Sequence, residues 1–302
     1  MKRIVTMQDL SCLGKCSLTV AQPVLSSMGC ACSVLPTAVL STHTGFPGPA
    51  VRDLSEFARP AMEHWQTIGA EFDGILTGYL ANRDQAELAL ELFDRFGRQA
   101  VIVHDPAMAD HGRLYGGMDP QMVEAHRQLC RRADLILPNL TEGALLAGIG
   151  YQNRTDLEFC QQIATELLKT SAKAVLLTGF SLSPDTVGFY YTDGTREFAH
   201  LGPRVPRNCH GTGDLFAAVV MGGMMSGLSV PESGKLRRNL STEPSQIPGQ
   251  IPGSVWNLRQ NWAGWRRSAE GYWRDRLKPK AALASCGGFF HNDDPPWKII
   301  RL

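Results

Sequence analysis

The first 230 residues alternate between short apolar runs and longer amphipathic stretches, and this alternation restricts the fold more than any other feature. Parallel sheets bury short apolar runs on both faces. We therefore predict strands at residues 3–6, 32–36, 74–77, 100–104, 135–137 and 174–178. Helical periodicity is found between them, at residues 16–28, 54–68, 83–96, 120–130 and 157–168. Repeated strand-then-helix units predict an α/β fold with a doubly wound, mostly parallel sheet flanked by helices. Residues 187–192 and 195–200, joined through Asp193-Gly194, predict a late β-hairpin.

The composition is that of a globular protein with 302 residues, 43% of them hydrophobic and 20% charged. A formal net charge of +1 gives no reason to expect nucleic-acid binding. Neither a signal-peptide core nor a run long enough to span a membrane is found. The eight cysteines show no Cys-x-x-Cys pair and no spacing typical of zinc. We therefore expect a cytoplasmic protein with reduced thiols and no membrane partner.

A glycine turn and a carboxylate stand where an apolar helix is predicted to begin, in the sequence Gly211-Thr212-Gly213-Asp214. Two glycines allow backbone N–H groups to converge on an anion, and a helix N-terminus adds partial positive charge there. Beside a phosphoryl group in transfer, Asp214 would accept the proton of an attacking hydroxyl. The alternative is that Asp214 only caps the helix.

Ligands of doubly wound sheets collect at the carboxyl ends of the strands, so the loops there are the candidate site. The Gly-Lys pair after the first strand lacks the upstream glycine of a phosphate-binding loop. Asp105 and Asp110 follow the fourth strand and are suited to hold Mg²⁺ directly or through water, or to act as turn residues. After the fifth strand, Asn139 and Glu142 have the spacing of a helix capping box.

Seven segments, taken in order, resemble the pyridoxal kinase family of the ribokinase-like superfamily. They are the opening strand leading to Ser11 and residues 41–46, 77–80, 105–110, 138–142, 177–179 and 211–214. The resemblance covers about residues 1–230, which we predict to form one vitamer kinase domain. It is greatest to bacterial pyridoxamine/pyridoxal kinases, in which the γ-phosphoryl group of ATP moves to the 5′-hydroxymethyl oxygen of a B6 vitamer. The resemblance thus implies ATP and Mg²⁺ as cofactors, a small-molecule vitamer as substrate, and a homodimer.

The resemblance also implies roles for individual residues. Asp214 would be the general base, and the N–H groups of Gly211, Thr212, Gly213 and Asp214 would form the anion hole. The vitamer pocket would be lined by Ser11, Thr42, His43 and Tyr79. Contacts on the nucleotide side would come from Asn139, Thr178 and Gly179. Mg²⁺ would be organised by Asp105, Asp110 and Glu142. Residues 43–52 and 107–117 would be flaps that exclude water.

The chain differs from the family, or from a related family, at or near three residues. Ala109 stands where the family usually has glycine, so we expect strain in the turn that presents Asp110. Asp214 occupies the loop position at which related hydroxymethylpyrimidine kinases carry a cysteine. This favours a B6 vitamer as substrate, with a hydroxymethylpyrimidine-type kinase as the alternative. We interpret Cys209 as a neighbour of the loop rather than a nucleophile.

Residues 231–302 differ from the rest of the chain. They hold 12 Lys and Arg against 6 Asp and Glu, and five of the six tryptophans. Pro and Gly interrupt every helical stripe of useful length. We interpret the segment as an atypical, poorly ordered tail that arose from a frame change in the coding DNA near codon 231. A basic appendage that binds a partner or an anionic surface is the alternative. In both cases the helix after Asp214 would lack its usual cover, so a catalytically impaired vitamer-binding protein is a third interpretation of function.

Overall fold

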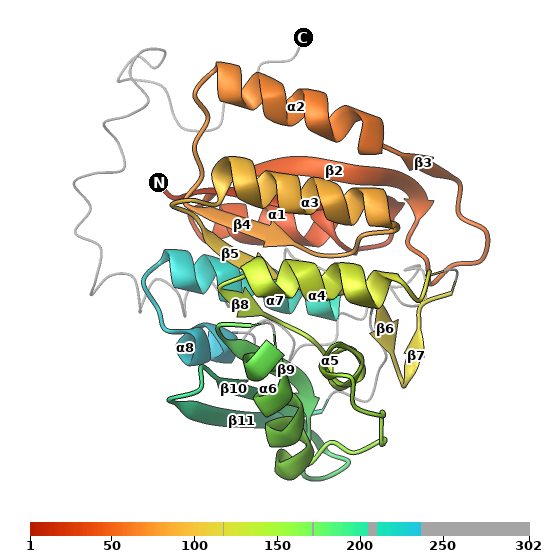
Figure 1. Ribbon diagram of the computed structural model, residues 1–302, viewed down its shortest axis with the longest axis vertical. Helices are drawn as coiled ribbons and strands as arrows, with labels where there is room; N and C mark the ends of the chain where they lie inside the picture. Colours follow the sequence, from red (N-terminus) through yellow and green to blue (C-terminus); the bar gives the residue numbers. More distant parts are fainter. Residues whose placement is uncertain (117, 171, 205–209, 237–302) are drawn as a thin grey trace, which may run out of the picture. The chain divides into compact units, whose positions relative to one another are not determined.

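The computed structural model describes residues 1–116, 118–170, 172–204 and 210–236, and these residues form one large sheet flanked by helices (Figure 1). Its nine strands follow the order β11-β10-β9-β8-β5-β4-β1-β2-β3. The strands from β9 to β2 run parallel, and the two edges are antiparallel. The strands are β1 (Arg3–Leu13), β2 (Ala31–Thr42), β3 (Val51–Asp53), β4 (Gly74–Thr77), β5 (Val101–His104), β8 (Leu135–Ile136), β9 (Val175–Phe180), β10 (Thr186–Thr192) and β11 (Glu197–Pro203). The prediction of a doubly wound, mostly parallel sheet is confirmed.

Helices cover both faces of the sheet (Figure 1). One face carries, in contact order, α2 (Ser55–Thr67), α3 (Arg83–Phe96), α4 (Met122–Arg132), α5 (Leu140–Ala147) and α6 (Leu157–Thr170). The other face carries α1 (Leu18–Ser27), α7 (Thr212–Met225) and α8 (Val230–Lys235). A small separate hairpin consists of β6 (Ala109–Asp110) and β7 (Arg113–Leu114), within the predicted flap at residues 107–117. The side chains between the sheet and the helices α2 to α6 form a continuous apolar core.

The first two strands are longer than the sequence predicted. β1 and β2 continue past residues 6 and 36 and pair with each other up to their last residues, so that Ser11 lies opposite Leu40. The predicted ends of these strands, at residues 6 and 36, are therefore wrong. Gln8, Asp9 and Ser11 are polar and yet buried, so this part of the strand lacks the apolar signal from which strands are predicted.

The predicted tail begins inside a short helix. A capping box formed by Ser229 and Glu232 starts α8. α8 packs closely on α7, because a Cβ atom placed on Gly223 would lie 2.5 Å from Oγ of Ser233. Residues 237–302 and Cys209 lie outside the described residues, so the domain boundary at residue 231 stays a prediction. No helix in the described part of the chain is both long enough and apolar enough to cross a membrane.

Candidate active site

A cavity of about 560 Å³ lies at the carboxyl ends of the parallel strands, the size range of small-molecule sites. Of the residues predicted for the site, only Thr42 does not line it; Thr42 is the last residue of β2 and pairs with Leu13. The predicted residues that line the cavity are Ser11, His43, Tyr79, Asp105, Asp110, Asn139, Glu142, Thr178, Gly179, Gly211, Thr212, Gly213 and Asp214. Residues from opposite ends of the sequence thus meet in one place.

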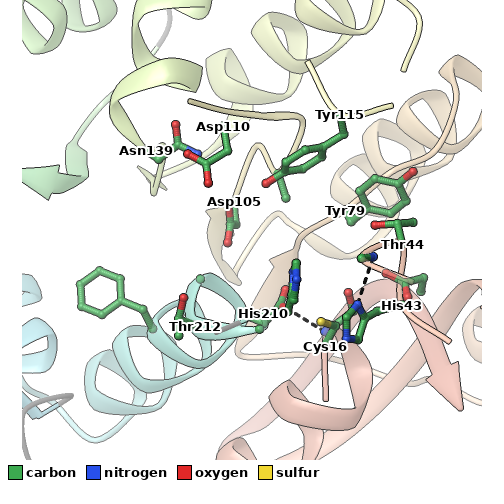
Figure 2. Close-up of a pocket in the computed structure, with 18 of the residues that line it drawn as sticks. Cys16, His43, Thr44, Tyr79, Asp105, Asp110, Tyr115, Asn139, His210 and Thr212 are labelled. Carbon is green, nitrogen blue, oxygen red and sulfur yellow. Dashed lines mark hydrogen bonds between the residues drawn. The ribbon is translucent and has the colours of Figure 1, made fainter. Parts of the chain in front are cut away.

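Figure 2 shows how the cavity is arranged. Asp110 and Asn139 lie beside each other on one side, and His43 and Tyr79 lie on the opposite side. Asp105 lies between these two groups, and Thr212 marks the first turn of α7. The helix N-terminus therefore opens on a space that is bordered by polar groups from several strands.

The glycine loop before α7 depends on the absence of a side chain at Gly211. This residue has φ of 78°, in the left-handed region that glycine adopts most readily. A Cβ atom at this position would lie 2.2 Å from the carbonyl oxygen of Lys15, a distance that no real side chain tolerates. Gly211 therefore lets the start of α7 approach the loop after β1, and it directs the first N–H groups of the helix toward the cavity.

Asp214 lies in the first turn of α7 and is held from the other end of the chain. Its Oδ2 accepts a hydrogen bond of 2.8 Å from the backbone N–H of Ser17. Burial raises the pKa of Asp214 to about 6; the Ser17 hydrogen bond opposes this shift, and the charge of Asp9 adds to it. The carboxylate is thus ionised at neutral pH but has a pKa close enough to act as a base. Ser17 itself has φ of 50°, an uncommon conformation for serine.

His43 is fixed in an aromatic cluster beside the glycine loop. Its Nδ1 accepts the backbone N–H of Gly45 at 3.1 Å, so a neutral ring carries its proton on Nε2. The ring lies 4.6 Å from the ring of His210 and 4.7 Å from that of Phe46, measured between centroids. Burial, followed by the neighbouring His210, lowers the pKa of His43 and favours the neutral form. The imidazole is therefore held in place at the edge of the cavity, where it offers an apolar ring face and a hydrogen-bonding nitrogen.

Glu142 forms the predicted capping box with Asn139 at the start of α5. Its Oε2 accepts the N–H of Asn139 at 2.8 Å, and its Oε1 accepts those of Met108 at 3.1 Å and Ala109 at 3.4 Å. The Asn139 amide donates in turn to the carbonyl oxygen of Ala109 at 2.7 Å. Burial raises the pKa of Glu142 against these three donors. This carboxylate joins α5 to the β6–β7 hairpin, and both of its oxygens are occupied.

The fit of Mg²⁺ to the site depends on Asp105. The Asp105 carboxylate is buried and accepts no hydrogen bond from any described residue, and its Oδ2 lies near Gly213. Burial, followed by the charges of Glu142 and Asp214, raises its pKa. Among the described residues, no three His, Cys, Asp or Glu side chains form a ready metal site. A magnesium ion held mainly by phosphate oxygens needs only one or two carboxylates, so the donors present fit such an ion.

The expected strain at Ala109 is absent. Ala109 lies in β6 and does not have positive φ; in this hairpin the left-handed residues are His111, at 51°, and Gly112, at 78°. The backbone reverses direction there rather than at Ala109, so alanine fits its position. Asp110 is more than half exposed, and its Oδ1 accepts the N–H of His111 at 2.8 Å.

Several residues that line the cavity were not predicted. They are Asp9, Cys16, Ser17, Leu40, Leu137, Val187, His210 and Phe216, whereas Thr44, Gly45, Ala107, Tyr115 and Gly116 belong to the two predicted flaps. His210 directly precedes the glycine loop, and that adjacency was a signal that could have pointed to it. Ser17 contacts Asp214, which is 197 positions away, and such a contact leaves no local pattern.

The fold and the cavity together define a phosphotransferase of the ribokinase-like type. The model of the phosphomethylpyrimidine kinase family matches residues 28–238. The chain therefore belongs to this family. Its fold neighbours include the crystal structure of pyridoxal kinase from Lactobacillus plantarum, with a TM-score of 0.80 and 31% identity over 90% of this chain and 99% of that one. The expected enzyme class and superfamily are confirmed.

Curated relatives carry two kinds of kinase name. The chain is 29% identical to the pyridoxine/pyridoxal/pyridoxamine kinase of Bordetella avium, over 75% of this chain and 79% of the relative. It is also 29% identical to the hydroxymethylpyrimidine/phosphomethylpyrimidine kinase of Streptomyces coelicolor, over 63% and 68%. The pyridoxal kinase of Leishmania donovani in complex with ADP and pyridoxamine shares the fold, with a TM-score of 0.75 and 24% identity over 88% and 96% of the two chains. The protein is thus a kinase of the vitamin B6 or pyrimidine type.

Proposed function

We propose that the protein transfers the γ-phosphoryl group of ATP to the 5′-hydroxymethyl oxygen of a B6 vitamer, with Asp214 as the general base. The observation that carries this proposal is the position of the Asp214 carboxylate. It stands in the first turn of α7 beside the glycine loop, it lines the cavity, and one backbone N–H orients it. The similarity to kinases named for pyridoxal, and the ADP in a fold neighbour, support the choice of substrates.

In the proposed reaction, Asp214 takes the proton of the acceptor hydroxyl while the hydroxyl oxygen forms a bond to the γ-phosphorus. The bond from that phosphorus to the bridging oxygen breaks, and ADP leaves. The N–H groups from Gly211 to Asp214 stabilise the charge on the transferred group, helped by the helix N-terminus. Ser17 occupies only Oδ2 of Asp214, so Oδ1 remains available for the hydroxyl.

The remaining residues position the two substrates. His43 and Tyr79 border the vitamer side of the cavity, and Asn139, Thr178 and Gly179 border the nucleotide side. Asp105 would hold Mg²⁺ together with the ATP phosphates, and the ion would neutralise charge on those phosphates. We assign Asp110 and Glu142 to contacts through water, because Glu142 already accepts three backbone N–H groups. A homodimer and a cytoplasmic location complete the proposal.

Hydroxymethylpyrimidine is the second candidate substrate. The family description and the Streptomyces coelicolor relative favour it. Both candidates are flat nitrogen heterocycles with a hydroxymethyl group, and the same base and anion hole serve both. The aspartate at position 214 favours the vitamer.

A substrate panel tests the proposal. Purified full-length protein is incubated with ATP, Mg²⁺ and pyridoxal, pyridoxamine, pyridoxine or hydroxymethylpyrimidine, and phosphorylated products are identified by mass spectrometry. We expect the protein to phosphorylate at least one vitamer faster than it phosphorylates hydroxymethylpyrimidine. Turnover of the pyrimidine alone would select the second candidate. Binding of a vitamer by folded protein without turnover would select the impaired vitamer-binding protein.

A further inference from the structure

The walls of the cavity are rich in carboxylates. Asp9, Asp105 and Glu142 are buried in these walls, and Asp214 stands in the first turn of α7. None of the described residues that line the cavity is a lysine or an arginine. A nucleoside triphosphate brings several more negative charges, and one Mg²⁺ offsets only part of them. Phosphoryl-transfer sites commonly add an arginine or a lysine, and here it would have to reach in from beside these walls.

The β6–β7 hairpin is anchored at the edge of this cavity. At its base, Glu142 of α5 accepts the N–H of Ala109 at 3.4 Å. At its turn, the hydroxyl of Thr141 accepts the N–H of Gly112 at 3.0 Å. The turn also lies against Tyr151, since a Cβ atom on Gly112 would lie 2.7 Å from a carbon of that ring. These contacts give the side chains of the hairpin a defined place relative to the cavity.

The two faces of the hairpin differ. Ala109 and Leu114 are directly opposite each other, and both pack on the apolar core. Asp110 and Arg113 form the neighbouring pair. Residues directly opposite each other have side chains on one face of the ladder, and successive residues alternate between the faces. Arg113 is therefore on the same face as Asp110, which lines the cavity and lies beside Asn139 (Figure 2).

The guanidinium of Arg113 has no acidic partner among the described residues. Its side chain is exposed, and it forms none of the ion pairs in that part of the chain. Asp110 does not pair with it, and one oxygen of Asp110 accepts the N–H of His111 instead. A guanidinium beside an acidic cavity is thus available to an anionic ligand, and its planar set of N–H donors matches the oxygens of a phosphoryl group.

We propose that Arg113 is a further catalytic residue, which donates hydrogen bonds to the non-bridging oxygens of the γ-phosphoryl group of ATP during its transfer. The inference rests on the proposed function, since it names a second group that acts in the same reaction. Asp214 takes the proton of the acceptor hydroxyl, whereas Arg113 transfers no proton and stabilises the charge on the transferred group. The γ-phosphoryl group then lies between the N–H groups of the glycine loop and the β6–β7 hairpin.

Nucleotide binding and turnover test this role together. Calorimetry with Mg²⁺ present would measure the affinities of ADP and of AMP-PCP, a non-hydrolysable ATP analogue that carries the third phosphoryl group. The proteins are wild type, Arg113→Gln, Arg113→Lys and the matched control Arg98→Gln, which removes another exposed arginine. Arg113→Gln is expected to bind AMP-PCP about 10-fold more weakly than wild type and ADP within about two-fold of it, since only the analogue has the contacted group.

Turnover is measured with the best substrate of the panel. In Arg113→Gln, kcat should fall about 10²-fold, the cost of losing a donor to the charge that develops in the transition state. Arg113→Lys keeps the charge but not the two-point contact, so its kcat should fall about 10-fold. The KM for the vitamer and the midpoint of urea unfolding should change little in both variants, which a general disturbance of the hairpin would not allow.

The outcomes are distinct. A folded Arg113→Gln that matches Arg98→Gln in its AMP-PCP affinity and kcat overturns the role of Arg113, and so does an equal loss of affinity for the two nucleotides. If Arg113→Gln does not fold, a wild-type kcat in Arg113→Lys overturns the role as well. A wild type that phosphorylates no compound of the panel, but whose affinity for AMP-PCP depends on Arg113, overturns the proposed reaction and supports the phosphate contact. A wild type that binds neither nucleotide overturns both.

Discussion

Glu142 and Asp214 each stand in the first turn of a helix and face the same cavity, but their surroundings differ. The oxygens of Glu142 accept three backbone N–H groups, two of them from the neighbouring hairpin segment. Asp214 accepts one backbone N–H from the described residues, that of Ser17. Both have a raised pKa because of burial. The comparison teaches that two acids in the same position at a helix N-terminus can differ in how many of their oxygens are left open, and this difference is the basis of the roles proposed for them.

The largest effect is expected for Asp214→Asn. The amide keeps the size of the side chain but cannot take a proton, so kcat/KM should fall about 10³-fold, within the range for loss of a general base. Steady-state kinetics with the best substrate of the panel would measure it. The affinity for that substrate and the midpoint of urea unfolding should change little. A variant that keeps more than a tenth of the wild-type rate would contradict the proposal that Asp214, rather than Glu142, acts as the base.

The next largest effect is expected for Gly211→Ala. The added methyl group would lie 2.2 Å from the Lys15 carbonyl oxygen, so the start of α7 must move away from the cavity. We expect turnover to fall about 10²-fold, the cost of misplacing one anion-hole donor.

Gly29→Ala is the matched control for Gly211→Ala. Gly29 has φ of 82° but open space around it. This variant carries the backbone strain without the clash, and it should keep its activity. Equal losses of kcat in the two variants would show that strain, rather than the position of α7, is responsible.

Glu142→Gln should affect stability more than chemistry. The amide keeps one acceptor oxygen but places an NH2 group where one or two of the three backbone N–H groups now find an acceptor, so the free energy of unfolding should fall by about 1–3 kcal/mol. Asp105→Asn should instead raise the Mg²⁺ concentration needed for half-maximal rate. Urea unfolding and magnesium titration of both variants would measure the two effects. The opposite pattern would make Glu142 the metal ligand.

The last prediction concerns stability alone and a buried histidine pair, His104 and His126. Both ring nitrogens of His104 form hydrogen bonds, one with Thr77 at 2.7 Å and the other with His126 at 3.0 Å. Burial lowers the pKa of His126 from 6.5 to about 4. Between pH 4 and pH 6.5 the unfolded chain binds more protons than the folded chain. The stabilising contribution of neutral His126 is therefore complete above pH 6.5 and is lost as the pH falls toward 4.

For one such site the free energy of unfolding should change by about 1.4 kcal/mol per pH unit. The raised pKa of Asp214 makes the free energy of unfolding change with pH in the opposite direction between pH 3.8 and about pH 6. The contribution of His126 must therefore be measured as a difference between a variant and the wild type. Urea unfolding from pH 4.5 to 7.5 should give a shallower slope for His126→Leu than for wild type and for a control variant, His64→Asn, that removes an exposed histidine. Parallel curves for His126→Leu and wild type would contradict this assignment.

The sequence predicted some elements to the residue. β4 and α3 have the predicted limits, because a four-residue apolar run and a cap at Asn82 are local signals. The capping box at α5 and the glycine loop were also predicted from local sequence. The far half of β1 was not, because its polar residues Asp9 and Ser11 line the cavity and interrupt the apolar run that predicts a strand. The contact between Ser17 and Asp214 joins residues 197 positions apart, and no local pattern encodes it.

The pH dependence of kcat/KM tests the central claim, that Asp214 is an open carboxylate acting as a base, most directly. The account predicts an acid limb with a midpoint near the raised pKa of Asp214, about 6. It also predicts that the midpoint moves to lower pH in Asp9→Asn, because the charge of Asp9 helps to raise that pKa. A rate that stays constant from pH 5 to pH 8 in the wild type would contradict the account.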